Sequence, residues 1–181
     1  MVAGSGLKIY DTMKHSLLFF AALCFATRAA DAQVIVRSKE DPSKILTLGE
    51  RMTPQTAWNR FGIRPVKSYT DDVFGDFIET YRYDNNKFEF RCFNSIAYDF
   101  AIYSERYTLI IDRKFFISVG MTIAELKRRI PADEMIIKRL TDDLFAVWFK
   151  ITGTEIFADD RLMLEVDAQE RILAMGWIIP D

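Results

Sequence analysis

The sequence reads GMTIAELKRRI at residues 120–130, and this stretch decides the predicted fold because residues 49–53, GERMT, begin in a similar way. Gly49 and Gly120 are 71 residues apart, and the same interval separates the Thr-Asp-Asp triplets at Thr70 and Thr141. Two matches in the same order at one offset indicate a supersecondary unit that is used twice. We therefore expect two repeats, residues 33–111 and residues 112–181.

A short capped helix is expected after the glycine of each repeat. Thr122 and Glu125 have the spacing of a capping box, and Pro131 marks the end of that helix. In the first repeat Thr53 is the expected N-cap, and Gly62 is the expected stop.

Strands are expected after each helix, where the apolar period changes toward two. These predicted strands are Phe77–Tyr83, Phe88–Cys92, Ile96–Leu109, Phe145–Ile151, Leu162–Val166 and Ile172–Ile179. A short apolar strand that leads to the glycine, at residues 45–49 and again at residues 115–120, is expected to open each repeat. Ala132–Leu140 fits a second short helix or a loop. The predicted fold class is α+β: two tandem helix-plus-antiparallel-sheet repeats form one domain, with the helices packed on one face of the sheet and the strands of the two copies edge to edge.

The Gly-Met-Thr start, the capped helix and the aromatic-rich meander resemble the repeat of beta-lactamase-inhibitor-protein-like domains, over about residues 45–181. Small outer-membrane assembly lipoproteins share that unit. The first repeat departs from the pattern by two extra residues between Gly49 and Met52, and the chain lacks the lipidated cysteine and the disulfides of these families. The resemblance implies only a class of function, which is the binding of another protein in the cell envelope or outside the cell.

Residues 1–32 are predicted to be a secretory signal peptide. A basic start at Met13-Lys14-His15 precedes the apolar run Ser16–Ala26, and Ala30-Asp31-Ala32 fits the cleavage pattern. Met13 is the expected initiator, and Gln33 is the expected first residue of a periplasmic or secreted protein. The apolar run is too short for a transmembrane segment, which needs roughly 20 residues.

The composition argues against several classes of function. A formal net charge of −2 gives no basic field for nucleic acid. His15, the only histidine, lies in the predicted signal peptide, and Cys92 is the only cysteine after it. Histidine-dependent nucleophiles, histidine-ligated metals and an internal disulfide are therefore not expected. We expect no catalytic residues, no metal site and no cofactor, and we expect Cys92 to be a buried core residue.

The strand register predicts a surface for a partner. The register that keeps the apolar side chains on one face pairs Cys92 with Tyr98, Phe90 with Phe100 and Phe88 with Ile102. The opposite face would then carry Glu89, Arg91, Asp99 and Tyr103, which we take as the candidate partner-binding residues. Aromatic residues and arginine are enriched at the energetic centres of protein interfaces.

The predicted function is thus a non-catalytic, protein-binding domain of the inhibitor, immunity or envelope-assembly type. One alternative is a hydrolase that uses paired carboxylates such as Asp142-Asp143 and Asp159-Asp160, although solvated turn charges are the better explanation because nothing in the sequence isolates one acidic residue in an apolar cleft. A second alternative is a carrier of a small apolar ligand or lipid, which requires an apolar cavity between sheet and helices.

Overall fold

The computed structural model describes residues 33–71, 75–150 and 160–178, and this part of the chain holds twelve strands and two helices. The predicted signal peptide lies outside the described residues. None of the described helices is long and apolar enough to cross a lipid bilayer.

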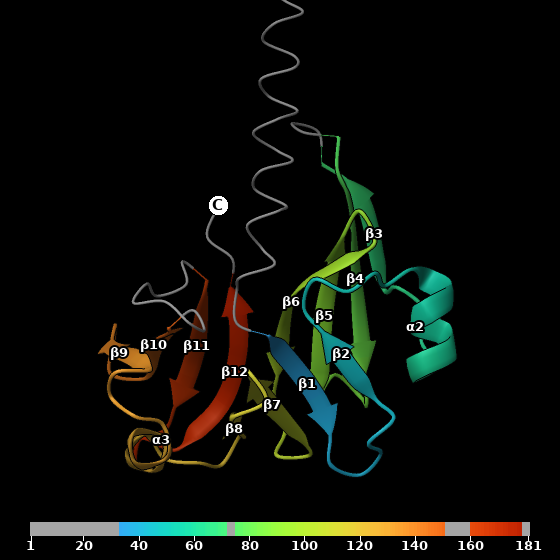
Figure 1. Ribbon diagram of the computed structural model, residues 1–181. Coiled ribbons are helices and arrows are strands. Elements are labelled where there is room, and N and C mark those ends of the chain that lie inside the picture. Colours follow the sequence, from blue (N-terminus) through green and yellow to red (C-terminus); the bar gives the residue numbers. More distant parts are fainter. Residues whose placement is uncertain (1–32, 72–74, 151–159, 179–181) are drawn as a thin grey trace, which may run out of the picture. The chain divides into compact units, whose positions relative to one another are not determined.

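The strands form two antiparallel sheets (Figure 1). The small sheet has the order β2-β1-β7-β8, formed by β1 (Val34–Ser38), β2 (Ile45–Thr47), β7 (Tyr107–Ile111) and β8 (Phe115–Ile117). The large sheet has the order β3-β4-β5-β6-β12-β11-β10-β9. Its strands are β3 (Lys67–Thr70), β4 (Phe77–Tyr83), β5 (Phe88–Phe93), β6 (Ile96–Ile102), β9 (Met135–Arg139), β10 (Leu144–Phe149), β11 (Arg161–Val166) and β12 (Ile172–Ile178).

The predicted fold class is wrong. The described chain is mostly β, and a second sheet takes part in the core where the prediction has only helices packed on one sheet in two repeats. The predicted strands at residues 45–49 and 115–120 contain β2 and β8, but two features hid the other half of the small sheet. The residues of β1 follow directly on the predicted signal peptide. The segment Ile96–Leu109, predicted as one strand, is divided between β6 and β7, which belong to different sheets.

The local helix signals were predicted correctly. α2 (Pro54–Phe61) begins at the N-cap Thr53, whose side chain accepts a hydrogen bond from the Thr56 backbone, and ends at Gly62 with φ 71°. α3 (Ile123–Arg129) begins with a capping box in which Thr122 and Glu125 bond each other's backbone N–H groups. Ala132–Leu140, left open between helix and loop, contains β9 instead.

Two groups of four strands meet at the centre of the large sheet. β3 to β6 precede β7 in the chain and β9 to β12 follow β8, and the groups join where β6 pairs with β12. Among the described residues three pairs make this junction: Met175 with Ile102, Gly176 with Ala101, and Trp177 with Phe100. The predicted repeat boundary, between residues 111 and 112, falls between the paired strands β7 and β8.

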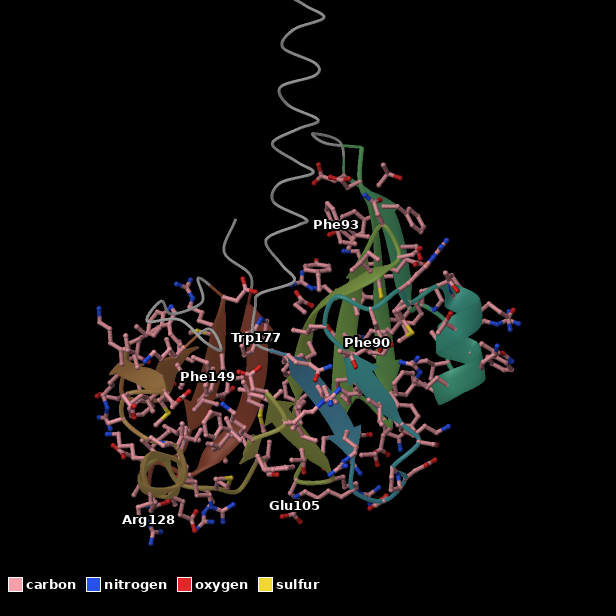
Figure 2. All side chains as sticks on the ribbon, viewed as in Figure 1. Phe90, Phe93, Glu105, Arg128, Phe149 and Trp177 are labelled. Carbon is pink, nitrogen blue, oxygen red and sulfur yellow. The ribbon has the colours of Figure 1, made fainter. Side chains whose placement is uncertain are left out.

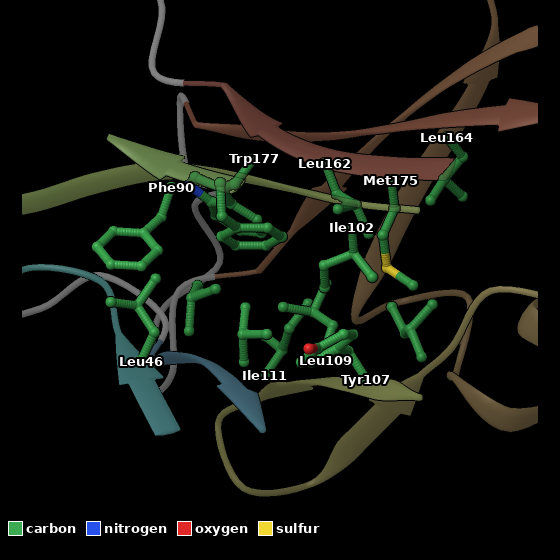
Figure 3. Close-up of a cluster of buried hydrophobic side chains, with 14 of the residues drawn as sticks. Leu46, Phe90, Ile102, Tyr107, Leu109, Ile111, Leu162, Leu164, Met175 and Trp177 are labelled. Carbon is green, nitrogen blue, oxygen red and sulfur yellow. The ribbon is translucent and has the colours of Figure 1, made fainter. Parts of the chain in front are cut away.

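The core lies between the two sheets. Figure 3 shows Leu46, Leu109 and Ile111 of the small sheet facing side chains of the large sheet, which include Phe90, Ile102, Leu162, Leu164, Met175 and Trp177. α2 adds Phe61, whose ring meets the rings of Phe88 and Phe90 at 6.3 and 5.6 Å. One face of the large sheet is therefore covered, and the alternation of side chains along each strand directs the other set to the opposite face.

The predicted register between β5 and β6 is correct for two of its three pairs. Phe88 pairs with Ile102 and Phe90 with Phe100, but Cys92 pairs with Ala97 because the register shifts between Arg91 and Cys92. Such a bulge sets two residues of one strand against one residue of the other. It takes Tyr98 out of the apolar row, and the Tyr98 ring lies 5.4 Å from the Arg91 guanidinium.

Candidate functional site

The face of the large sheet opposite the core carries a hollow of about 640 Å³, and we call this side the open face. Residues of five strands, β3 to β6 and β12, line the hollow, and side chains of matching parity in neighbouring strands share this face. The hollow is lined by Val66, Lys67, Tyr69, Thr80, Arg82, Glu89, Arg91, Asp99, Phe100, Ala101, Gly176 and Trp177.

Arg91 and Asp99 form the central ion pair of the hollow. They are register partners on β5 and β6, and the Arg91 guanidinium donates through Nε to Asp99 Oδ1 at 3.0 Å and through Nη2 to Oδ2. The Asp99 side chain is 9% exposed, whereas that of Arg91 is 46% exposed. Burial raises the pKa of Asp99 above its usual value, and the hydrogen bonds from Arg91 act in the opposite direction. The pair thus holds a buried carboxylate beneath a half-exposed cation.

A second ion pair lies beside the first. Arg82 on β4 is the register partner of Glu89 on β5, and its Nε donates to Glu89 Oε2 at 2.6 Å. The side chains are 49% and 27% exposed, so this pair is more hydrated than Arg91 and Asp99. Tyr103 is 53% exposed and interacts electrostatically with Glu89 and Arg82. Its partial burial raises the pKa of its hydroxyl group.

The floor and the outer wall of the hollow come from residues that the sequence analysis did not select. Ala101 and Gly176 form part of the floor, and a Cβ built on Gly176 would lie 3.2 Å from the Phe100 carbonyl oxygen. The wall includes Lys67 and Tyr69 of β3, with the Lys67 ammonium 4.7 Å from the centre of the Tyr69 ring. Lys67 and Tyr69 alternate with polar residues, which is the pattern of a strand with one set of side chains on each face. The pattern could not be recognised in advance, because β3 is short and polar and has no alternating apolar residues.

All four candidate partner-binding residues lie together. Glu89, Arg91 and Asp99 line the hollow, and the charges that act on Tyr103 place it beside Glu89. The hairpin turn at Asp84–Asn86, where each residue has a positive φ, could have identified Arg82 as well. Counting outward from that turn pairs Arg82 with Glu89, as the structure does.

The remaining candidates from the sequence do not gather at the hollow. Asp142 is fully exposed with Arg139 3.9 Å away, and Asp159 lies outside the described residues. Cys92 is fully buried, as predicted, and burial raises its pKa to about 12. Glu79, on β4, is 2% exposed and burial raises its pKa, but it shares its face with the core and does not line the hollow.

The lining of the hollow bears on the two alternative functions. Its two carboxylates, Glu89 and Asp99, are each bonded to an arginine, whereas a carboxylic acid that donates a proton at neutral pH needs a site without such a cation. A carrier of apolar ligands needs an apolar cavity, and the lining here is rich in charge. Within the described residues no three metal-binding side chains of the His, Cys, Asp or Glu types come together.

No protein-family model, curated protein or solved structure matches this chain. The resemblance to the inhibitor-type repeat therefore stays a prediction, and the functional argument depends on the open face alone.

Proposed function

We propose that this protein is a non-catalytic binding protein of the periplasm or the extracellular space, and that the open face of its large sheet holds another protein. The observation that carries the proposal is the pair of bonded arginine–carboxylate units in one hollow. Each arginine is half-exposed and already fixed in position by its carboxylate partner.

Fixed arginines favour binding because less side-chain freedom is lost when the partner arrives. Arg82 and Arg91 have half of their surface free to meet acceptor groups, and Tyr103 adds an exposed aromatic ring beside them. Tyrosine and arginine are among the residue types that are enriched at the energetic centres of protein interfaces. A wide, charged hollow also suits a protein surface better than it suits a small apolar molecule.

The predicted signal peptide supports the location, and it lies outside the described residues. The partner decides among the three types within this class. A secreted enzyme as partner makes the protein an inhibitor, a toxin makes it an immunity protein, and an outer-membrane component makes it an assembly factor.

The test begins with affinity capture of the partner from an envelope extract of the source cells, followed by calorimetry with the purified pair. We expect Tyr103→Ala and Arg82→Ala each to weaken binding at least tenfold, which corresponds to about 1.4 kcal/mol. Arg128→Ala is the matched control, because Arg128 is an exposed arginine on α3, away from the hollow (Figure 2). A partner whose affinity is unchanged by both open-face variants would refute the proposed face.

A further inference from the structure

Within the part of the chain that the structure describes, β3, the first strand of the large sheet, has one edge that pairs with no other strand. Among the described residues it pairs with β4 alone, and all four of its residues are exposed. An unpaired strand edge offers a row of backbone N–H and C=O groups to another strand. Natural proteins usually block such an edge, so the residues at this one indicate whether it is blocked or used.

The hydrogen-bond pattern identifies which residues of this edge point outward. The Asp71 N–H donates to the Asp76 carbonyl at 2.7 Å, in the same register that pairs Tyr69 with Ile78 and Lys67 with Thr80. In an antiparallel pair the bonded residues alternate, so Lys67, Tyr69 and Asp71 bond toward β4. The backbone groups of Ser68 and Thr70 therefore face the free edge.

The segment Lys67-Ser68-Tyr69-Thr70-Asp71 complements itself when a second copy runs antiparallel to it. Aligning Ser68 with Thr70 of the partner subunit lets the outward groups exchange four backbone hydrogen bonds. The same alignment sets Lys67 opposite Asp71 of the partner subunit, twice by symmetry, and sets Tyr69 opposite the partner's Tyr69. Opposite charges and aromatic rings in directly facing positions stabilise antiparallel pairs.

This charge pattern distinguishes a second copy from an unrelated strand. A lysine on an edge strand normally repels approaching strands. Here an acidic residue, Asp71, lies one position past the end of β3 and continues its register, so the two-fold arrangement sets a carboxylate opposite each lysine. Tyr69 at 39% exposure and Val66 at 56% exposure leave apolar surface at this edge for a copy to cover.

We propose that the protein forms a two-fold symmetric dimer through β3, in which the two large sheets join edge to edge. The dimer does not depend on the proposed binding function, but it would set two hollows on one continuous sheet, since Lys67 and Tyr69 belong both to the hollow and to this edge. A partner with two equivalent sites would then bind with increased avidity.

The test is sedimentation velocity on the purified protein, with the concentration raised to about 0.1 mM so that a dimer with a Kd of that order is visible. We expect the weight-average mass of the wild type to rise with concentration from that of one chain toward that of two, and Ser68→Pro to stay monomeric. Proline removes only the outward N–H of Ser68, a position at which edge strands tolerate it. The unfolding midpoint of Ser68→Pro shows that the monomer is folded.

Charge exchange provides the second measurement. Lys67→Asp alone should abolish the dimer by setting like charges opposite each other, and Lys67→Asp with Asp71→Lys should restore it. Lys114→Asp, at an exposed turn between β7 and β8, makes the same charge change and should leave the dimer intact. A wild type that is monomeric throughout, or a dimer that survives both Ser68→Pro and Lys67→Asp, overturns the proposal. Neither result affects the open-face binding test.

Discussion

The ion pair of Arg91 and Asp99 should respond unequally to the loss of either partner. Arg91→Met keeps a long unbranched side chain but removes the guanidinium, and it leaves Asp99, with 9% of its side chain exposed, as a buried charge without its cation. Asp99→Asn removes the buried charge and leaves Arg91, 46% exposed, able to turn toward water. The arginine substitution should therefore cost more stability.

The magnitudes follow from the exposure of each group. Breaking a fully buried pair costs about 3–5 kcal/mol and breaking an exposed pair less than about 1 kcal/mol, so half-exposed Arg91 suggests about 2 kcal/mol for Arg91→Met. Asp99→Asn keeps a hydrogen-bond acceptor and should cost about 1 kcal/mol. The double variant removes both charges and should cost about 1.5 kcal/mol, which is less than the two single costs combined.

The cost of Arg91→Met should also depend on pH. Burial already raises the pKa of Asp99, and without Arg91 the opposing hydrogen bonds are lost, so the pKa rises further. A carboxyl whose pKa is higher in the folded than in the unfolded state binds protons preferentially in the folded state. The stability lost at neutral pH should therefore return progressively as the pH falls below the pKa of Asp99 in the folded variant and toward about 4, the usual carboxyl pKa.

Urea unfolding of the three variants at pH 7 and at pH 5 measures both effects. Arg82→Met is the matched control, because its partner Glu89 is more exposed and the loss should stay below about 1 kcal/mol. The reasoning would be refuted by any of three results. The stability costs of Arg91→Met and Asp99→Asn could be equal, the costs could add strictly in the double variant, or the cost of Arg91→Met could be the same at both pH values.

Thr122→Ala removes the side chain that caps α3 and should lower stability by about 0.5–2 kcal/mol; an unchanged urea midpoint would show that the cap contributes nothing. Cys92 should react with a thiol reagent at pH 8 only as fast as the protein opens, because burial raises its pKa to about 12, and immediate labelling of folded protein would contradict its burial. Exported protein should begin at Gln33 when its intact mass is measured, and a mass that retains Met1 or Met13 would disprove the predicted cleavage.

The local features of the fold could be predicted because short-range chemistry determines them. The capping box at Thr122 and the left-handed stop at Gly62 depend on a few neighbouring residues, and both are present. The division of Ile96–Leu109 into two strands could not be predicted in this way. The turn near Ser104 carries no glycine or proline, and all five residues of β7 are buried, so they show no alternation.

The site was only partly predictable for a similar reason. Glu89 and Arg91 lie on the same strand with one residue between them, and the register pairs Arg91 with Asp99. The alternation of side chains along the sequence was therefore sufficient to predict that these three residues share a face. Lys67 belongs to an edge strand whose position beside β4 depends on tertiary packing. The bulge after Arg91 is also set by tertiary context, and it is why Tyr98 does not pair with Cys92.

The position of β12 has a consequence for the order in which the protein folds. β12 is the last described strand along the chain, yet it lies inside the large sheet between β6 and β11. During synthesis or export, every earlier strand of that sheet emerges before the strand that joins the two groups. Until residues 172–178 have been synthesised and paired, β6 and β11 each have an unpaired strand edge next to apolar core side chains.

A nascent chain of this topology therefore needs protection from premature strand pairing. The final step in the folding of the large sheet is the insertion of β12 between β6 and β11. A ribosome-stalled or proteolysed chain that ends before Ile172 would keep both edges exposed. Such fragments should aggregate or attract chaperones far more strongly than a chain from which the edge strand β3 is deleted.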